Sequence, residues 1–114
     1  MLNINERQAG DVTILDLDGS LIMGGGATVL RDAIQRLSEA GKTKALLNFA
    51  GIKYVDSSGI GELVSSLVTL NRDDGQLKLL NVTGRVEEVL SLSSLLSLFE
   101  VYDDEALALN SFVS

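Results

Sequence analysis

Residues 55–61 read VDSSGIG, and they connect a run typical of a buried strand with a pattern typical of an amphipathic helix. The strand-like run is ALLNF at residues 45–49, and the apolar helical stripe begins at Ile60. Asp and Ser are preferred at the N-cap of a helix, so this stretch is predicted to begin one. A serine that accepts phosphate here would also change the charge at an exposed point of the fold. The residues themselves leave two interpretations open, a cap alone or a cap that also acts as a switch.

Upstream of this stretch, the pattern predicts a hairpin, a helix and a strand. Residues 4–8 and 12–17 read as strands joined by a turn, and the second strand ends at Asp18-Gly19. The three glycines at residues 24–26 form a loop before a helix with apolar residues at helical spacing, which Gly41 ends. The following residues, 43–49, are apolar enough for a strand that is buried on both faces.

Downstream, the pattern predicts two more units of helix and strand and a last short helix. The stripe from Ile60 predicts a helix that stops near residues 73–75, and residues 77–82 read as the next strand. Thr83 is expected to cap a third helix. The last elements are expected to be a short strand at residues 98–102 and a fourth helix capped by Asp103.

The resulting order, β-β-α-β-α-β-α-β-α, defines the expected fold class. Strands that alternate with helices pair in parallel through right-handed crossovers, and the initial hairpin makes the sheet mixed. We therefore predict one α/β domain over residues 1–114, with a mixed sheet of four to five strands and about four helices. In such sheets, functional sites gather where strands end and helices begin. Asp56 and Ser57 fall at one of these junctions.

Composition and charge exclude several classes of function. The 114 residues are 46% apolar, enough for a core, and the formal net charge is −7. That charge argues against binding to nucleic acid or to an anionic membrane, which requires a basic surface. The chain contains no His and no Cys, which excludes Ser-His-Asp catalysis and a typical zinc site. It shows neither a secretory signal nor an apolar stretch of roughly 18 residues, so we expect a cytoplasmic protein, and we predict no cofactor.

Residues 52–61, IKYVDSSGIG, resemble the signature of the STAS domain family, the bacterial anti-sigma factor antagonists and their relatives. The resemblance covers nearly the whole chain. The stretch LDGSL at residues 17–21 resembles the Gly-x-Leu turn after the second strand of the family, and residues 80–86 and 99–103 fall where its later elements lie. The resemblance implies a STAS fold and a protein-binding module that is not an enzyme.

The resemblance also implies a switch and its partners. In the family, the serine directly after the aspartate is phosphorylated by a serine kinase that is also the anti-sigma factor, so by this match Ser57 is the phosphoacceptor. The unphosphorylated antagonist binds that kinase and frees the sigma factor, phosphorylation breaks the complex, and a serine phosphatase restores it. The interface is expected to contain, besides Ser57, the residues Asp56, Ser58, Gly59, Ile60, Gly19, Ser20 and Ile22.

The chain departs from the family's pattern in one place. Members that serve as kinase substrates often carry an acidic residue just after Gly-x-Leu, where this chain has Ile22 followed by Met23. These two side chains are either an exposed apolar contact or part of the core, and the core is favoured.

One alternative function is that of a STAS scaffold in a larger assembly, such as a stressosome or a lipid-transport complex. An enzyme with a nucleophilic Ser57 lacks a histidine base, and nucleotide binding at residues 24–26 lacks the lysine and spacing of a P-loop.

Overall fold

The computed structural model describes residues 1–112 and contains the elements that the sequence predicts. The predicted order and the mixed sheet are confirmed, since the described part holds five strands and four α-helices. In chain order they are β1 (Leu2–Ala9), β2 (Val12–Leu21), α1 (Gly26–Glu39), β3 (Lys44–Val55), α2 (Ser57–Arg72), β4 (Gln76–Leu80), α3 (Gly84–Leu92), the short 3-10 helix η1 (Leu96–Leu98), β5 (Val101–Tyr102) and α4 (Glu105–Asn110).

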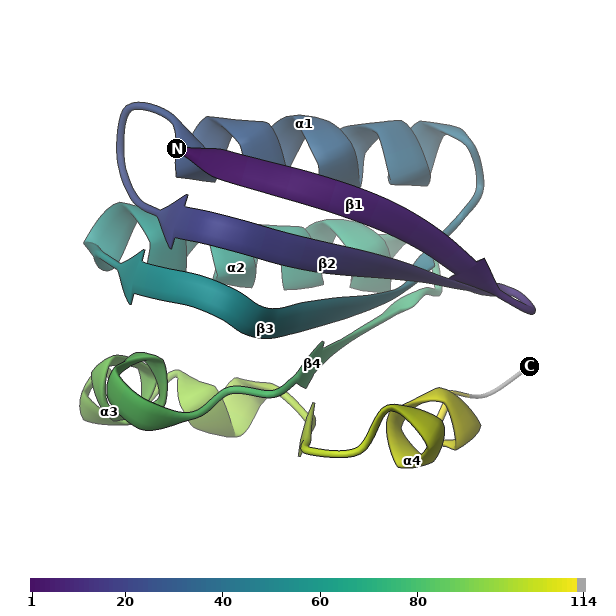
Figure 1. The fold of residues 1–114 in the computed structure, drawn as a ribbon. Coiled ribbons are helices and arrows are strands. Elements are labelled where there is room, and N and C mark those ends of the chain that lie inside the picture. Colours follow the sequence, from purple (N-terminus) through teal and green to yellow (C-terminus); the bar gives the residue numbers. More distant parts are fainter. Residues whose placement is uncertain (113–114) are drawn as a thin grey trace.

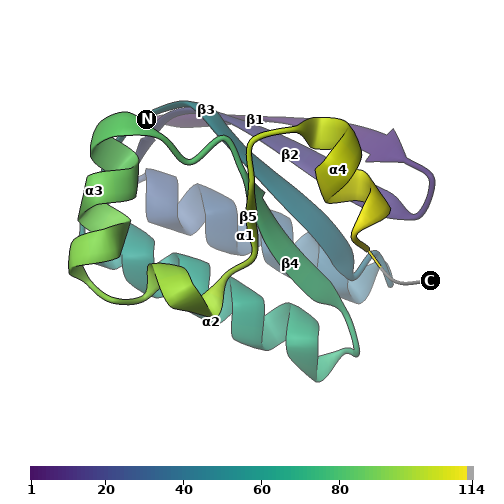
Figure 2. The same cartoon turned by 90° about the horizontal axis from the view of Figure 1, so that it is seen from below.

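The strands form one sheet in the order β1-β2-β3-β4-β5. β1 pairs with β2 in the antiparallel sense, as expected for the hairpin, and each later pair is parallel. α1 and α2 lie side by side on one face of the sheet (Figure 1 and Figure 2). β2 and β3 point in the same direction, so their carboxyl ends meet at the end of the sheet where α2 begins (Figure 1).

Each face of the sheet has its own core because alternate residues of a strand point to opposite faces. The larger core packs the sheet against α1, α2 and α3, and its strand residues include Leu15, Leu47 and Leu79. The smaller core lies on the other face and contains Val12, Ile14, Leu46, Leu80 and Ala108 of α4. The central strand β3 is therefore buried on both faces along its first half, as its sequence predicts.

A row of polar side chains crosses four strands on the same face as α4. Arg7 of β1 contacts the Asp16 carboxylate of β2 at 2.6 Å, and Asn48 of β3 donates to the same carboxylate at 2.9 Å. Asn81, just after β4, donates to the side-chain oxygen of Asn48 at 3.0 Å. Arg7 also contacts Glu105 of α4 at 2.7 Å. Ion pairs this close to solvent contribute little stability, so the row mainly fixes the position of α4 on the sheet.

Two helices begin directly against the end of β2, and both need glycine there. A Cβ atom on Gly26, in the first turn of α1, would overlap the carbonyl oxygen of Ser20. A Cβ atom on Gly59, in the first turn of α2, would overlap the carbonyl oxygen of Leu21. Glycine alone permits this approach because it has no side chain. The starts of both helices are thus placed by two successive residues of one strand.

The predicted strand at residues 98–102 is wrong in its first three residues. Leu96–Leu98 form η1, and only Val101–Tyr102 pair with β4. The amides of Leu98 and Phe99 donate to carbonyls three residues earlier, so this part of the leucine-rich stretch forms local hydrogen bonds instead of joining the sheet. Within residues 1–112, no helix combines the length and the apolar character that crossing a membrane requires.

The predicted cap of the last helix is displaced by one residue. The N-cap of α4 is Asp104, whose carboxylate accepts a hydrogen bond from the amide of Leu107 at 3.0 Å. Asp103 lies one position earlier, outside the helix, because β5 ends at Tyr102 and the chain needs a bend before the helix can start. A run of acidic residues supplies several capping candidates, and only the geometry of the bend selects among them.

A pair of alanine substitutions tests the contact between α2 and β2. Gly59→Ala is expected to destabilise the protein by about 1–3 kcal/mol, because its Cβ meets the Leu21 carbonyl group, which cannot move without shifting the strand. Gly61→Ala, two residues later on an open face of the same helix, is expected to stabilise by up to about 1 kcal/mol. Urea unfolding of both variants measures the difference, and a neutral Gly59→Ala would show that the helix does not need this approach.

Candidate functional site

The predicted junction lies between the end of β3 and the start of α2, at the same end of the sheet as the carboxyl end of β2. β3 ends at Val55, Asp56 is the N-cap, and Ser57 is the first helical residue. The end of β2 and the loop that follows it lie against this junction, since the Asp56 amide donates to the carbonyl oxygen of Leu21 at 3.3 Å and the Asp56 carboxylate accepts from the amide of Met23. The site is therefore built from a helix start and a glycine-rich loop that are far apart in sequence.

The Asp56 carboxylate joins these two segments. One oxygen accepts a hydrogen bond from the amide of Gly59 at 2.9 Å, which caps α2. The other oxygen accepts one from the amide of Met23 at 3.0 Å, which holds the loop. The sequence predicts the first bond, because capping is local, and gives no sign of the second. We define the loop–helix clamp as Asp56 with these two amides.

The clamp lowers the pKa of Asp56 below its ordinary value, chiefly through the amide of Met23 and then through that of Gly59. A carboxyl group with a lowered pKa stabilises the fold at pH values above its pKa in the unfolded chain. That contribution is lost as the pH falls through the lowered pKa of the folded state. Near neutral pH, Asp56 is thus ionised, and its negative charge lies directly beside Ser57.

The two adjacent serines of the motif differ in accessibility. Ser57 is exposed, and within residues 1–112 its hydroxyl group makes no hydrogen bond. Ser58 is only half-exposed. The side chain of Asp56, not that of either serine, caps the helix. The hydroxyl of Ser57 is thus free of a structural role in the described part of the chain.

The other residues expected at the interface fall into two groups. Asp56, Ser58, Gly19, Ser20 and Ile22 are partly exposed around the junction. Gly59 and Ile60 are buried, so they support the surface from below and offer it no side-chain atoms of their own.

The interpretation that Ile22 and Met23 belong to the core is wrong for Met23. Its side chain is 73% exposed, whereas Ile22 is half-buried. Met23 points outward because its backbone is held by Asp56 and the chain then turns through Gly24, which has a φ of 90°. Tyr54, which the sequence prediction did not include in the site, is 62% exposed two residues before Asp56. Both are large apolar groups beside the clamp.

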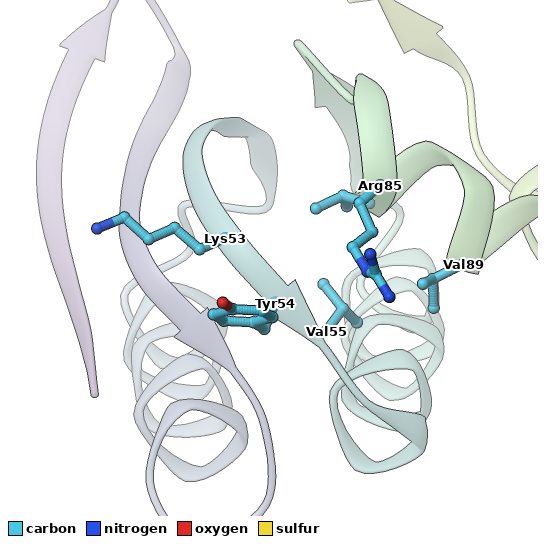
Figure 3. A pocket seen from close by; sticks show the side chains of 6 residues that line it. Lys53, Tyr54, Val55, Arg85 and Val89 are labelled. Carbon is cyan, nitrogen blue, oxygen red and sulfur yellow. The ribbon is translucent and has the colours of Figure 1, made fainter.

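A small hollow of about 40 Å³ adjoins the end of β3, between that strand and the start of α3 (Figure 3). Arg85 extends from α3 across the hollow, whereas the Lys53 side chain points away from it on the far side of β3 (Figure 3). Both cations are exposed, and neither forms an ion pair with any residue of the described chain. In a chain with a net charge of −7, the site thus has unpaired positive groups at its border. The hollow is lined by Lys53, Tyr54, Val55, Arg85, Val86 and Val89.

Comparison with known proteins gives consistent matches. The model of the STAS domain matches residues 3–108. An anti-sigma-B factor antagonist of Staphylococcus epidermidis is 29% identical over 72 residues, which cover 63% of this chain and 67% of that protein. A crystal structure from Thermotoga maritima superposes with a TM-score of 0.88 at 24% identity, covering 96% of this chain and 93% of the other. The Bacillus cell fate determinant SpoIIAA, in its phosphorylated form, superposes with a TM-score of 0.72 at 22% identity, covering 96% and 97%. At these identities, the two structures show the fold.

The clamp can be separated from simple capping by comparing two aspartates. Asp56→Ala is expected to lower the stability of the protein through loss of the cap and to speed amide exchange at both Met23 and Gly59. Asp104→Ala removes an equivalent cap from α4 and should leave the amide of Met23 unchanged. Hydrogen exchange followed by NMR measures both. Unchanged exchange at Met23 in Asp56→Ala would contradict the role of the clamp.

Proposed function

This chain belongs to the STAS domain family, and we propose that within it the protein acts as an anti-sigma factor antagonist. It binds an anti-sigma factor that is also a serine kinase, and so frees a sigma factor. Phosphorylation of Ser57 ends this binding, and a serine phosphatase restores it. The staphylococcal relative, named an anti-sigma-B factor antagonist, and the existence of a phosphorylated form of SpoIIAA support this proposal.

The observation that carries the proposal is the environment of Ser57. It is the first residue of α2, it is exposed, and its hydroxyl has no hydrogen-bond partner in residues 1–112. A kinase can reach such a hydroxyl without unfolding the helix. Ser58 is less accessible, which favours Ser57 as the acceptor.

Phosphate at this position acts differently on the fold and on an interface. It adds roughly −1.5 to −2 charges at neutral pH. The N-terminus of α2 favours negative charge, so the helix tolerates the phosphate even though the ionised Asp56 opposes it. A partner that covers Ser57 must instead desolvate this charge, and any acidic group it presents there is repelled. The fold therefore survives phosphorylation while the complex does not.

The surface around Ser57 suits a protein partner. Met23, whose amide donates to Asp56, and Tyr54, two residues before Asp56, both expose large side chains. Lys53 and Arg85 line the hollow beside Tyr54. Met, aromatic residues and Arg are enriched at protein interfaces. Since Ile22 stands where related kinase substrates often have an acidic residue, the loop contact in this protein is apolar rather than ionic. These residues make binding to this kinase specific.

The proposed role is binding in the cytoplasm and not catalysis. A nucleophilic serine requires a base within hydrogen-bonding reach, and the hydroxyl of Ser57 has none among residues 1–112. The nearest carboxylate, that of Asp56, already accepts two amide hydrogen bonds. Purified protein incubated with ATP alone should therefore take up no phosphate.

Three variants test the switch against the cognate kinase by calorimetry. Ser57→Asp is expected to weaken binding at least about tenfold, because it places a permanent charge in the interface. Ser57→Ala should keep the affinity and lose the response to ATP. Ser65→Asp adds the same charge at an exposed position about two turns along α2 and serves as the control. Equal affinity of Ser57→Asp and the unaltered protein would exclude the proposed switch.

Peptide mapping of protein purified from its native cells tests the acceptor independently of any partner. We expect phosphate on Ser57 and none on Ser58, because the former is the more accessible hydroxyl. Phosphate found only on residues other than Ser57 would contradict the assignment of Ser57 as the acceptor.

A further inference from the structure

The chain beyond Arg85 has an unusual charge distribution. Residues 86–114 contain no Lys and no Arg, although the whole chain has nine of them. The same segment contains six carboxylates, at Glu87, Glu88, Glu100, Asp103, Asp104 and Glu105. A surface built from this segment carries uncompensated negative charge unless another part of the chain neutralises it. Arg7 and Lys78 do so for Glu105 and Glu100, whereas Glu87 and Glu88 form no ion pair with any described residue.

Two adjoining hollows lie on this segment, and we call them together the α3–β5 groove. Their volumes are about 460 and 560 Å³, and Ser91 lines both. They are an order of magnitude larger than the hollow beside β3. The first hollow is lined by Glu87, Glu88, Ser91 and Leu92, and the second by Ser91, Ser94, Leu96, Ser97, Phe99 and Val101.

The groove displays apolar side chains that the fold does not cover. Leu92 is 86% exposed and Val101 is 39% exposed, and both line it. Leu98, on η1 between them in sequence, is 52% exposed. Covering a side chain of this size contributes about 1.5–3 kcal/mol. A partner that covers these side chains buries its own apolar groups against them. Its edge then lies beside the carboxylates of Glu87 and Glu88 on α3.

We infer that the α3–β5 groove binds an amphipathic, positively charged helix of a partner protein. Leucine-like side chains of that helix fill the two hollows, and its Lys or Arg residues face Glu87 and Glu88. The use of an apolar helix face in a groove, with charges beside it, is a common mode of recognition. This surface is made of α3, η1 and β5, so it is separate from Ser57 and the loop–helix clamp and does not depend on the function proposed for them.

Charge also excludes the other occupants. A second copy of this chain would bring its own acidic segment to the groove, and like charges facing each other weaken such a dimer. Nucleic acid and anionic lipid are repelled for the same reason. An extended strand added beside β5 would find an edge of only two paired residues, Val101–Tyr102. A basic amphipathic helix is the occupant that fits the charge, the shape and the apolar side chains of the α3–β5 groove.

A synthetic helix tests this inference on the whole protein. The probe is a peptide of Leu and Lys, about 15 residues long, with all its Leu residues on one helical face. Titrated into isotopically labelled protein, it is expected to shift NMR signals of residues 87–101 and to leave those of Met23 and Ser57 unchanged. A peptide of the same composition with scrambled order, and one with Glu in place of Lys, should bind at least about tenfold more weakly.

Matched variants separate the groove from general electrostatics. The double variant Glu87→Lys/Glu88→Lys is expected to weaken binding of the peptide at least about tenfold, and Leu92→Ser should weaken it as well. Asp32→Lys/Glu39→Lys makes the same change of charge at exposed positions on α1 and should have little effect. The NMR spectrum of each variant verifies its fold.

Several results would overturn the inference. One is equal weakening by the two double variants, and another is a shift of signals outside the groove. Sedimentation of the protein alone gives a third: a dimer that Leu92→Ser dissociates would assign the groove to a second copy of this chain.

Discussion

The close contact between the end of β2 and the first turns of two helices governs the rest of this structure. Successive carbonyl groups, those of Ser20 and Leu21, lie where a side chain on Gly26 or Gly59 would have to be. A backbone contact of this kind leaves little freedom of position, because neither carbonyl can move without disturbing the sheet. α1 and α2 are therefore fixed relative to each other by their common contact with the end of β2 and by their own packing. The surface proposed to bind a partner lies at this end of the sheet, so its backbone is held by the same contacts.

This rigidity is compatible with the proposed switch, in which a charge added at one point changes the surface and not the fold. Asp56 holds the loop and the helix together through two amides, and the adjacent Ser57 hydroxyl makes no hydrogen bond to any residue in the described part of the chain. A group added to Ser57 changes what a partner meets and leaves the clamp in place. The two surfaces of the molecule also differ in sign. The hollow near Ser57 is bordered by Lys53 and Arg85, whereas the α3–β5 groove is bordered by Glu87 and Glu88, and none of these four forms an ion pair within residues 1–112.

The elements and the junction were predictable from the sequence because their signals are local. The apolar periods of β3 and α2 and the capping preference of Asp56 lie within a few residues of one another. The bond from Met23 to Asp56 was not predictable, since the two are 33 positions apart and the donor is a backbone amide that any residue possesses. The stretch around Leu98 was assigned to a strand because a run of leucines and serines fits several conformations, and only its pairing with β4 decides where a strand begins.

The clamp binds the loop through the backbone amide of residue 23. The shape of the loop therefore does not depend on which side chain that residue carries. The methionine side chain has no part in the bond, so most substitutions at that position preserve the shape of the loop. Proline is the exception, because it has no amide hydrogen to donate. Genes that duplicate and diverge can thus alter the exposed side chain at this point, and with it the contact proposed for the partner, at little cost in stability. A cell that contains several such domains can keep its pathways apart by changing one side chain on a shared scaffold.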